Sequence, residues 1–248
     1  MTELLLTFDF PPMGGGIARW MAELAARFPP GELIVSTGTL PGADDRFPSV
    51  VDRIGVRSGR LRTLPGLWAW RRRVRALAEK HEVSFAWCGN IRPAGYVAAR
   101  TKTRDGVPFG ILLHGGDLLQ LRAKFRRRGL KRAAARTLLG GADLLVANSR
   151  WTAALCREVT AELGLEPRRL EVVPLGSDPE RFRPGIDTGP LEARLGLRPG
   201  RRILTVARLV PHKGIDTAIA ATAELRRHFP DLEYLVAGTG PDRDRLGH

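Results

Sequence analysis

Short apolar runs alternate with helical patterns over most of this chain, and that alternation constrains the fold more than any other feature. Runs typical of buried strands occur at 3–8, 32–36, 83–88, 108–114, 142–148 and 169–174. Helical spacing of apolar residues lies between them, as in 15–28, 67–81 and 150–164. Strands that alternate with helices in this way predict a parallel sheet with helices on both faces. The expected fold class is therefore α/β.

A stretch rich in proline and glycine, 176–200, interrupts this pattern. Beyond it the pattern restarts with a strand at 202–207, a helix at 214–228 and a strand at 233–237. We expect a first domain over 1–183, a linker over 184–200 and a second domain over 201–248. Because two strands with one helix leave a sheet half covered, the sequence predicts that the second domain is partial and the chain is cut within it.

The chain is strongly basic: its 248 residues carry 40 Lys and Arg against 26 Asp and Glu, a formal net charge of +14. This excess predicts an anionic partner, which can be nucleic acid, a lipid surface or a phosphorylated substrate. Two cysteines, Cys88 and Cys156, are too few for a disulfide framework, so we expect a reducing, cytoplasmic setting. The N-terminal apolar run is too short for a signal peptide or a membrane span. Metal-ligand spacing is absent, so we expect no metal.

Basic residues concentrate on the segment 118–139, which has the pattern of one amphipathic helix. Its eight cations are Arg122, Lys124, Arg126, Arg127, Arg128, Lys131, Arg132 and Arg136. A second basic cluster, WRRRVR, occupies 70–75. Such a helix is typical of proteins that meet anionic lipid heads, although solvated charge gives the same pattern. No nucleic-acid partner is expected, because recognition motifs are missing and few aromatic residues interleave the charges.

Two motifs in the first domain follow predicted strands, which is where open α/β sheets bind ligands. In FPPMGGGIARW, Gly15 and Gly16 place backbone N–H groups at the start of a helix, where they suit an anion or simply form a turn. In LLHGGDLL, His114 ends a strand and Asp117 follows three residues later. This pair could orient a sugar or exchange protons. In the alternative, Asp117 caps a helix over 118–139 and His114 is merely packed.

A third motif, LTVARLVPHKGID, lies in the second domain and carries Arg208 and Lys213. They stand at a junction where a strand gives way to a turn and a helix. Two fixed cations beside a helix N-terminus would form an anion site. Two ordinary surface cations are the alternative.

In their order along the chain, these segments resemble the GT-B-fold glycosyltransferases of family four, the retaining group that uses sugar nucleotides. FDFPPMGGGIARW resembles the family's glycine loop, LLHGGD its histidine-bearing strand end, and ANSRWTAALCREV the start of its N-S helix. VVPLGSDPERFRP resembles its P-N-G-V-D-x-x-x-F-x-P crossover, and LTVARLVPHKGID its G-R-L-x-x-x-K-G-x-D donor segment. LVAGTGPDRDRL resembles the next strand and its G-x-G-P turn. The resemblance spans residues 3 to 246 and implies a Rossmann-like N-terminal domain and the beginning of a second one.

The resemblance also implies how the donor is held. Arg208 and Lys213 would bind the diphosphate of a UDP- or GDP-sugar, and Gly15 and Gly16 would add backbone N–H groups. Such groups stabilise the negative charge of the departing nucleoside diphosphate, so neither a metal nor another cofactor would be needed. Retention by front-face attack, in which a donor phosphate oxygen takes the acceptor's proton, would need no protein nucleophile.

For the rest of the site, the resemblance implies that His114 faces the donor sugar as the catalytic residue and that Asp117 binds sugar or acceptor. The expected acceptor is a lipid or polysaccharide of the cell envelope, reached from the cytoplasm with 118–139 docked on an anionic membrane surface. The family's E-x₇-E element is absent from the sequence. The alternative is therefore a non-catalytic fragment that binds an anionic surface or partner.

Overall fold

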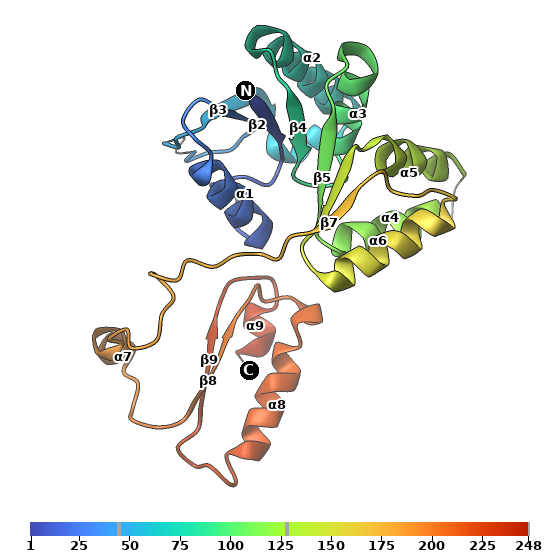
Figure 1. Ribbon diagram of the computed structural model, residues 1–248. Helices are drawn as coiled ribbons and strands as arrows, with labels where there is room; N and C mark the ends of the chain where they lie inside the picture. The colour runs from blue at the N-terminus through green and yellow to red at the C-terminus, as the bar shows by residue number, and fades with distance from the viewer. Residues whose placement is uncertain (44–45, 127–128, 248) are drawn as a thin grey trace. The chain divides into compact units, whose positions relative to one another are not determined.

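The computed structural model describes residues 1–43, 46–126 and 129–247. The chain divides into two compact units, Met1–Gly176 and Ser177–His248, each built on its own parallel sheet (Figure 1). The segment 184–200, expected as a linker, belongs to the second unit and contains the short helix α7 (Gly189–Leu195).

Seven parallel strands form the sheet of the first unit, in the order β3-β2-β1-β4-β5-β6-β7. They are β1 (Glu3–Leu6), β2 (Leu33–Thr39), β3 (Val50–Arg57), β4 (Phe85–Cys88), β5 (Phe109–Leu113), β6 (Leu144–Ala147) and β7 (Leu170–Val172). The strand order reverses between β1 and β4. In open α/β sheets a crevice opens at such a point, outside the carboxyl ends of the strands. The predicted α/β class is confirmed.

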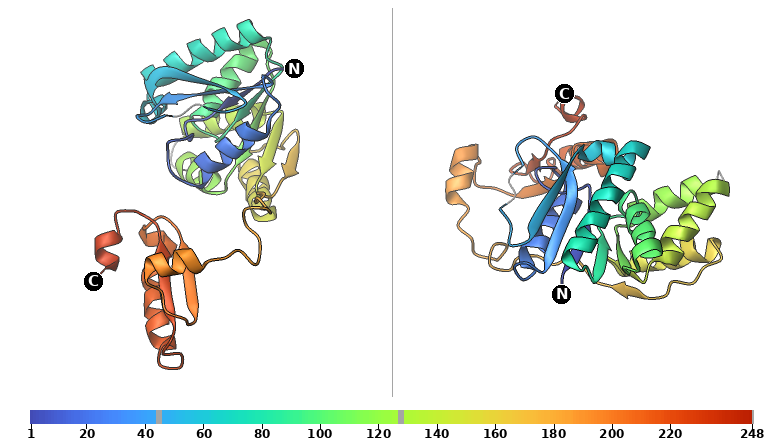
Figure 2. Two further views of the ribbon diagram at one scale, coloured as in Figure 1. Left: turned by 90° about the vertical axis from the view of Figure 1, so that its left-hand side faces the viewer. Right: turned by 90° about the horizontal axis from the view of Figure 1, so that it is seen from above.

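Six α-helices pack on this sheet: α1 (Gly16–Arg27), α2 (Leu64–His81), α3 (Ala94–Asp105), α4 (Gly116–Phe125), α5 (Gly129–Gly141) and α6 (Arg150–Glu162). Successive side chains of a strand face opposite sides of the sheet. Leu4 and Leu6 accordingly enter a core shared with α2 to α6, whereas Leu5 enters a second core shared with α1. Figure 2 shows α1 and α2 on opposite sides of the sheet.

The expectation of one helix over 118–139 is wrong, because the structure has two. Helix α4 ends at Phe125, and α5 begins at Gly129 and packs against α4. Glycine is the weakest helix former after proline, so Gly129 favours a break where a charged run alone predicts continuity. Arg127 and Arg128 lie outside the described residues. Nor is Asp117 the N-cap, since Gly115 holds that position.

The second unit contains a pair of parallel strands, β8 (Arg202–Val206) and β9 (Glu233–Ala237). They are joined by the 3₁₀ turn η2 (Pro211–Lys213) and by α8 (Ile215–Leu225), and a short helix, α9 (Arg243–Leu246), follows. Leu209, Ile215 and Leu232 are the buried apolar side chains of this unit among the described residues. Among the described residues of either unit, no helix is long and apolar enough to cross a membrane.

Candidate active site

The glycine loop connects β1 to α1 at the carboxyl edge of the sheet. Gly15 is the residue before the helix and has a φ of 128°, a conformation that other residues rarely adopt. No side chain caps α1, so the N–H groups of its first turn are open to an anion. Side-chain carbons built at Gly15 and Gly16 would meet nothing within 4 Å. The structure therefore leaves room for a ligand at this helix end.

His114 joins three elements at the same edge. Its Nε2 lies 2.7 Å from the carbonyl oxygen of Gly89, at the end of the neighbouring strand β4. The ring also meets Trp20 of α1 edge-on, with 5.1 Å between ring centroids and an interplanar angle of 88°. Because a carbonyl can only accept, Nε2 must carry the proton that it donates. Only Nδ1 of His114 is then left to contact a substrate.

Asp117 lies in the first turn of α4, where one carboxylate oxygen orders the turn and the other is unused. Oδ1 accepts hydrogen bonds from the backbone N–H of His114 at 3.2 Å and of Leu118 at 2.8 Å. Oδ2 is buried and forms no hydrogen bond of normal geometry with the described residues, although the backbone N–H of Ile91 is near enough to lower the pKa of the carboxyl. Burial raises the pKa of Asp117, and the nearby charge of His114 opposes that rise. A buried acceptor without a donor is costly, which suits a ligand hydroxyl.

A cavity of about 250 Å³ opens beside Asp117 and is rich in cations. Its other lining residues are Arg62, Leu67, Ile91, Arg92, Pro93, Tyr96, Gln120 and Lys124. The charge of Arg92 lowers the pKa of Lys124, and partial burial, Lys131 and Arg62 act in the same direction. An anion in this cavity would relieve the repulsion between these cations. Its cations come from three separate segments: Arg62 from the 3₁₀ helix η1 (Ser58–Arg62), Arg92 from the loop after β4, and Lys124 from α4. Lys124 was part of the basic segment 118–139, but no sequence spacing predicted that it would meet the other two.

Asn90 is a second buried group that the sequence did not single out. It directly follows Gly89 after β4 and is only 5% exposed. Neither its Oδ1 nor its Nδ2 has a hydrogen-bond partner in the described parts of the chain. Most buried polar groups in native proteins are paired, so an unpaired amide at the strand-order reversal marks a binding position. In the sequence, the position of Asn90 directly after a predicted strand was the one feature that could have pointed to it.

Arg208 and Lys213 belong to the second unit, on the connection from β8 to α8. Both side chains are exposed, and neither forms an ion pair within the described residues. Lys213 ends η2, and α8 begins two residues later without a side-chain cap. Two unpaired cations and an uncapped helix N-terminus are therefore carried by one connection.

A glycine turn after β9 fixes the backbone that carries Arg208. The N–H of Leu209 donates to the carbonyl of Thr239 at 2.9 Å, and the N–H of Asp242 donates to the carbonyl of Leu209 at 3.2 Å. A side-chain carbon at Gly238 would lie 1.8 Å from the carbonyl oxygen of Ala207, and one at Gly240 would lie 2.2 Å from that of Leu209. Only glycine allows this approach of the two segments.

Family models match both units of the chain. The model described as Glycosyltransferase Family 4 matches residues 14–181. The chain belongs to glycosyltransferase family 4. A second model, Glycosyl transferases group 1, matches residues 194–248. The family predicted from the motifs is confirmed.

Curated relatives of this family 4 chain are named as transferases of the same kind. A GDP-mannose-dependent alpha-(1-6)-phosphatidylinositol monomannoside mannosyltransferase from Mycobacterium tuberculosis is 29% identical over 251 residues, covering 98% of this chain and 62% of the relative. A D-inositol 3-phosphate glycosyltransferase from Nocardia farcinica is 39% identical over 112 residues, covering 44% of this chain and 24% of the relative. The chain thus spans 62% of the length of the first of these relatives.

Solved structures show the same fold. Anabaena Alr3699/HepE, determined in complex with UDP and glucose, matches with a TM-score of 0.72 at 19% identity. The match covers 100% of this chain and 64% of that chain. The fold is α/β of the GT-B type, as predicted. The individual roles of Arg208, Lys213 and His114 stay predictions.

Proposed function

We propose that this family 4 protein is a retaining glycosyltransferase that moves a hexose from a nucleoside diphosphate sugar to a lipid acceptor. The observation that carries the proposal is the pair of unpaired cations, Arg208 and Lys213, beside the uncapped start of α8. A sugar nucleotide presents two adjacent phosphates, and cations at a helix N-terminus suit that charge. GDP-mannose is the donor of choice, because the M. tuberculosis relative is named for it.

The two cations would act mainly as the reaction proceeds. Negative charge grows on the diphosphate as the bond from the sugar's anomeric carbon to the phosphate oxygen breaks. Positioned cations stabilise that charge more in the transition state than in the bound donor, which lowers the barrier. In this proposal Arg208 and Lys213 take the place of a metal ion.

His114 is proposed to orient the donor sugar. Its Nε2–H is committed to the Gly89 carbonyl, and Trp20 supports the ring. The free Nδ1 would accept a hydrogen bond from a sugar hydroxyl, or donate one when the ring is protonated. A side chain fixed by two contacts binds with little loss of entropy, so His114 is suited to precise orientation of the anomeric carbon.

The cavity beside Asp117 is proposed as the acceptor site. The free Oδ2 of Asp117 would accept a hydrogen bond from the acceptor hydroxyl, and Arg62, Arg92 and Lys124 would bind an acceptor phosphate. The hydroxyl oxygen forms the new bond to the anomeric carbon on the same face of the sugar from which the phosphate leaves. Its proton passes to that phosphate oxygen, so the nucleoside diphosphate leaves and the configuration is retained. We place this reaction at the cytoplasmic face of the membrane, where a lipid acceptor lies.

A transfer assay tests the proposal. The protein is incubated with GDP-mannose or UDP-glucose and phosphatidylinositol, products are weighed by mass spectrometry, and their anomeric configuration is read by NMR. We expect an α-linked product from an α-linked donor, and a fall in kcat of about a hundredfold in His114→Ala. His228→Ala, which removes an exposed histidine of the second unit, is the matched control and should leave kcat unchanged. An inverted product would contradict the mechanism, and full activity in His114→Ala would remove its assigned role.

A further inference from the structure

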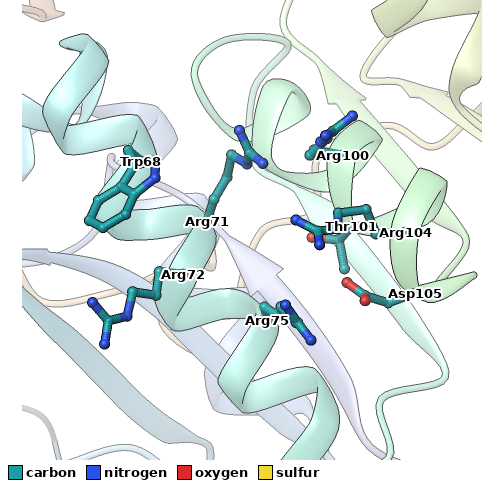
Figure 3. Close-up of a pocket in the computed structure, with 8 residues that line it drawn as sticks. All are labelled: Trp68, Arg71, Arg72, Arg75, Arg100, Thr101, Arg104 and Asp105. Atoms are coloured by element: carbon teal, nitrogen blue, oxygen red, sulfur yellow. The ribbon is translucent and has the colours of Figure 1, made fainter.

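Five arginines line a groove between α2 and α3, outside the proposed transfer site. The groove has a volume of about 220 Å³ and is shown in Figure 3. Arg71, Arg72 and Arg75 come from α2, and Arg100 and Arg104 come from α3. In α2, the apolar residues that alternate with these arginines face the core, so the helix presents its charge outward.

The positive charge of this groove is largely uncompensated. Asp105 is the single acidic residue among those that line it. Arg75 forms an ion pair at 2.7 Å with Glu79, which does not line the groove. Over the described residues, the other four arginines form no ion pair. Like charges held close together repel, so a bound polyanion would stabilise the groove.

Exposed apolar side chains lie directly beside the arginines. An adjoining cavity of about 730 Å³ shares Trp68, Arg71 and Arg100 with the groove. Its other lining residues are both apolar and polar: Leu64, Leu67, Tyr96, Ala99 and Leu138, with Arg62, Thr103 and Thr137. Trp68 is 62% exposed and Leu64, one turn earlier, is 83% exposed. The guanidinium of Arg72 lies 5.9 Å from the centroid of the Trp68 ring. A tryptophan flanked by arginines is typical of the interface between lipid headgroups and acyl chains.

The segment 118–139 is less suited to that role than its sequence indicated. Arg122 pairs with Glu158 at 3.1 Å and also with Glu162, and Arg126 pairs with Glu162 at 2.7 Å. The guanidinium groups of Arg132 and Arg136 donate to carbonyl groups at the end of α6. Cations there complement the helix dipole. These four side chains thus hold α4 and α5 against α6.

We propose that the α2–α3 groove docks the protein on an anionic lipid surface. The groove arginines bind phosphate groups of the lipid heads, and Leu64 and Trp68 enter the acyl boundary. A lipid is favoured over nucleic acid because large apolar side chains adjoin the charge, whereas a nucleic-acid groove needs aromatic platforms along a basic track. This inference requires neither a bound sugar nucleotide nor transfer, so it can fail while the proposed function holds.

Vesicle co-sedimentation of the 248-residue chain tests the inference. Phosphatidylcholine vesicles with and without phosphatidylglycerol are compared, and soluble glycerol phosphate and an RNA oligonucleotide are added as competitors. We expect binding only to the anionic vesicles, with an affinity that falls as salt rises. Arg71→Gln combined with Arg104→Gln should weaken binding about thirty-fold, since each basic residue near such a surface contributes roughly fivefold.

Lys131→Gln combined with Arg157→Gln is the matched control, because it removes the same charge from α5 and α6. It should bind vesicles like the native chain, and circular dichroism should show that both double variants are folded. Trp68→Ala should weaken vesicle binding without changing its salt dependence. Equal loss in the control would show that net charge alone binds the vesicles and would overturn the site. Tighter binding to RNA than to vesicles, or complete displacement by glycerol phosphate, would overturn the lipid assignment.

Discussion

At the scale of single residues, the environment of each side chain decides its chemistry more than its type does. His114 and Asp117 stand three positions apart, and the sequence allowed either a site or a packed, capped turn. The structure shows an ordered turn in which Gly115, not Asp117, is the N-cap of α4, and a role of the pair in a site stays a prediction. Oδ1 of Asp117 orders the turn, whereas its Oδ2 and the Nδ1 of His114 form no hydrogen bond of normal geometry with the described residues. A residue can therefore stabilise a local turn and still present a free atom to a ligand.

Asp117 gives a prediction about pH. Burial raises its pKa, so the folded chain holds the proton to a higher pH than an exposed aspartate does. If the ionised carboxylate accepts a hydrogen bond from the acceptor hydroxyl, kcat/KM should fall as pH drops through that raised pKa. Asp117→Asn should lower kcat/KM about a hundredfold at neutral pH and abolish this acidic limb. A pH profile of transfer in both proteins checks the prediction, and an unchanged limb in the variant would assign it to another group.

Asp117→Asn should lower activity, but it should not lower the stability of the fold. A group whose pKa is raised by folding stabilises the fold below its unfolded pKa, and that stabilisation is lost as pH rises through the folded value. Ionised Asp117, at pH values above its raised pKa, is therefore less favourable for the fold than the protonated group. Asp117→Asn should show an unfolding free energy at neutral pH no lower than that of the native chain in urea titrations. Lower activity with retained stability would separate a role in the site from a role in the fold.

Among the helices and strands, hydrogen bonds and ion pairs of single side chains connect the ends of neighbouring elements. Asp143, just before β6, accepts hydrogen bonds from Lys102 Nζ at 2.5 Å and from the Phe109 N–H at 3.0 Å, and pairs with Arg168 at 3.2 Å. Burial acts to raise the pKa of Asp143, but these bonds and the nearby cations outweigh it, so the pKa is lowered. The carboxylate thus connects α3, β5 and the start of β7.

Asp143→Asn is expected to lower the unfolding free energy by about 1–3 kcal/mol, the cost of breaking hydrogen bonds to a charged group. Because folding lowers its pKa, Asp143 stabilises the fold above its ordinary value of 3.8, and this contribution is lost as pH falls through the lowered value. Urea unfolding at neutral and acidic pH measures the difference between native and variant proteins, which should shrink in acid. Glu79→Gln, which breaks only the exposed pair with Arg75, is the control and should leave the unfolding free energy nearly unchanged.

The glycine turn after β9 gives a second prediction at this scale. In Gly238→Ala the new methyl group would overlap the Ala207 carbonyl, so the segment carrying Arg208 must move. GDP binding should weaken about tenfold or more by calorimetry. At Gly247 of the same unit, the nearest atom to such a methyl group is 3.6 Å away, so Gly247→Ala should bind GDP normally. Unchanged GDP binding in Gly238→Ala would show that the turn does not position Arg208.

Periodicity in the sequence predicted the strands of both sheets except the edge strand β3, and it predicted a buried strand at the other edge, where β7 is mostly exposed. The β3 sequence VVDRIGVR is half exposed and includes Asp52, so it lacks the continuous apolar run that marked the central strands. The sequence did not predict the split between α4 and α5, because the pattern of apolar and basic residues continues from one helix into the other. Neither the unpaired state of Asn90 nor the meeting of Arg62, Arg92 and Lys124 beside Asp117 could be predicted, because sequence spacing does not show which separate segments come together at the edge of a sheet.

At the scale of the whole molecule, the net charge of +14 has several separate uses. The arginines of α4 and α5 hold α6, the cations near Asp117 suit an anionic acceptor, and Arg208 with Lys213 suit a diphosphate. The groove between α2 and α3 is the part of the excess that we assign to a lipid surface. Composition predicted an anionic partner, and our proposals assign anionic groups to distinct places in each unit.

Calorimetric titration with GDP tests whether the second unit binds a nucleoside diphosphate through Arg208 and Lys213. The native chain should bind GDP saturably, and Arg208→Ala combined with Lys213→Ala should weaken binding about a hundredfold or more. Arg194→Ala combined with Arg226→Ala removes two exposed arginines of the same unit and should bind like the native chain. Equal affinity of the native chain and the Arg208–Lys213 variant would contradict the account, as would equal loss in both double variants.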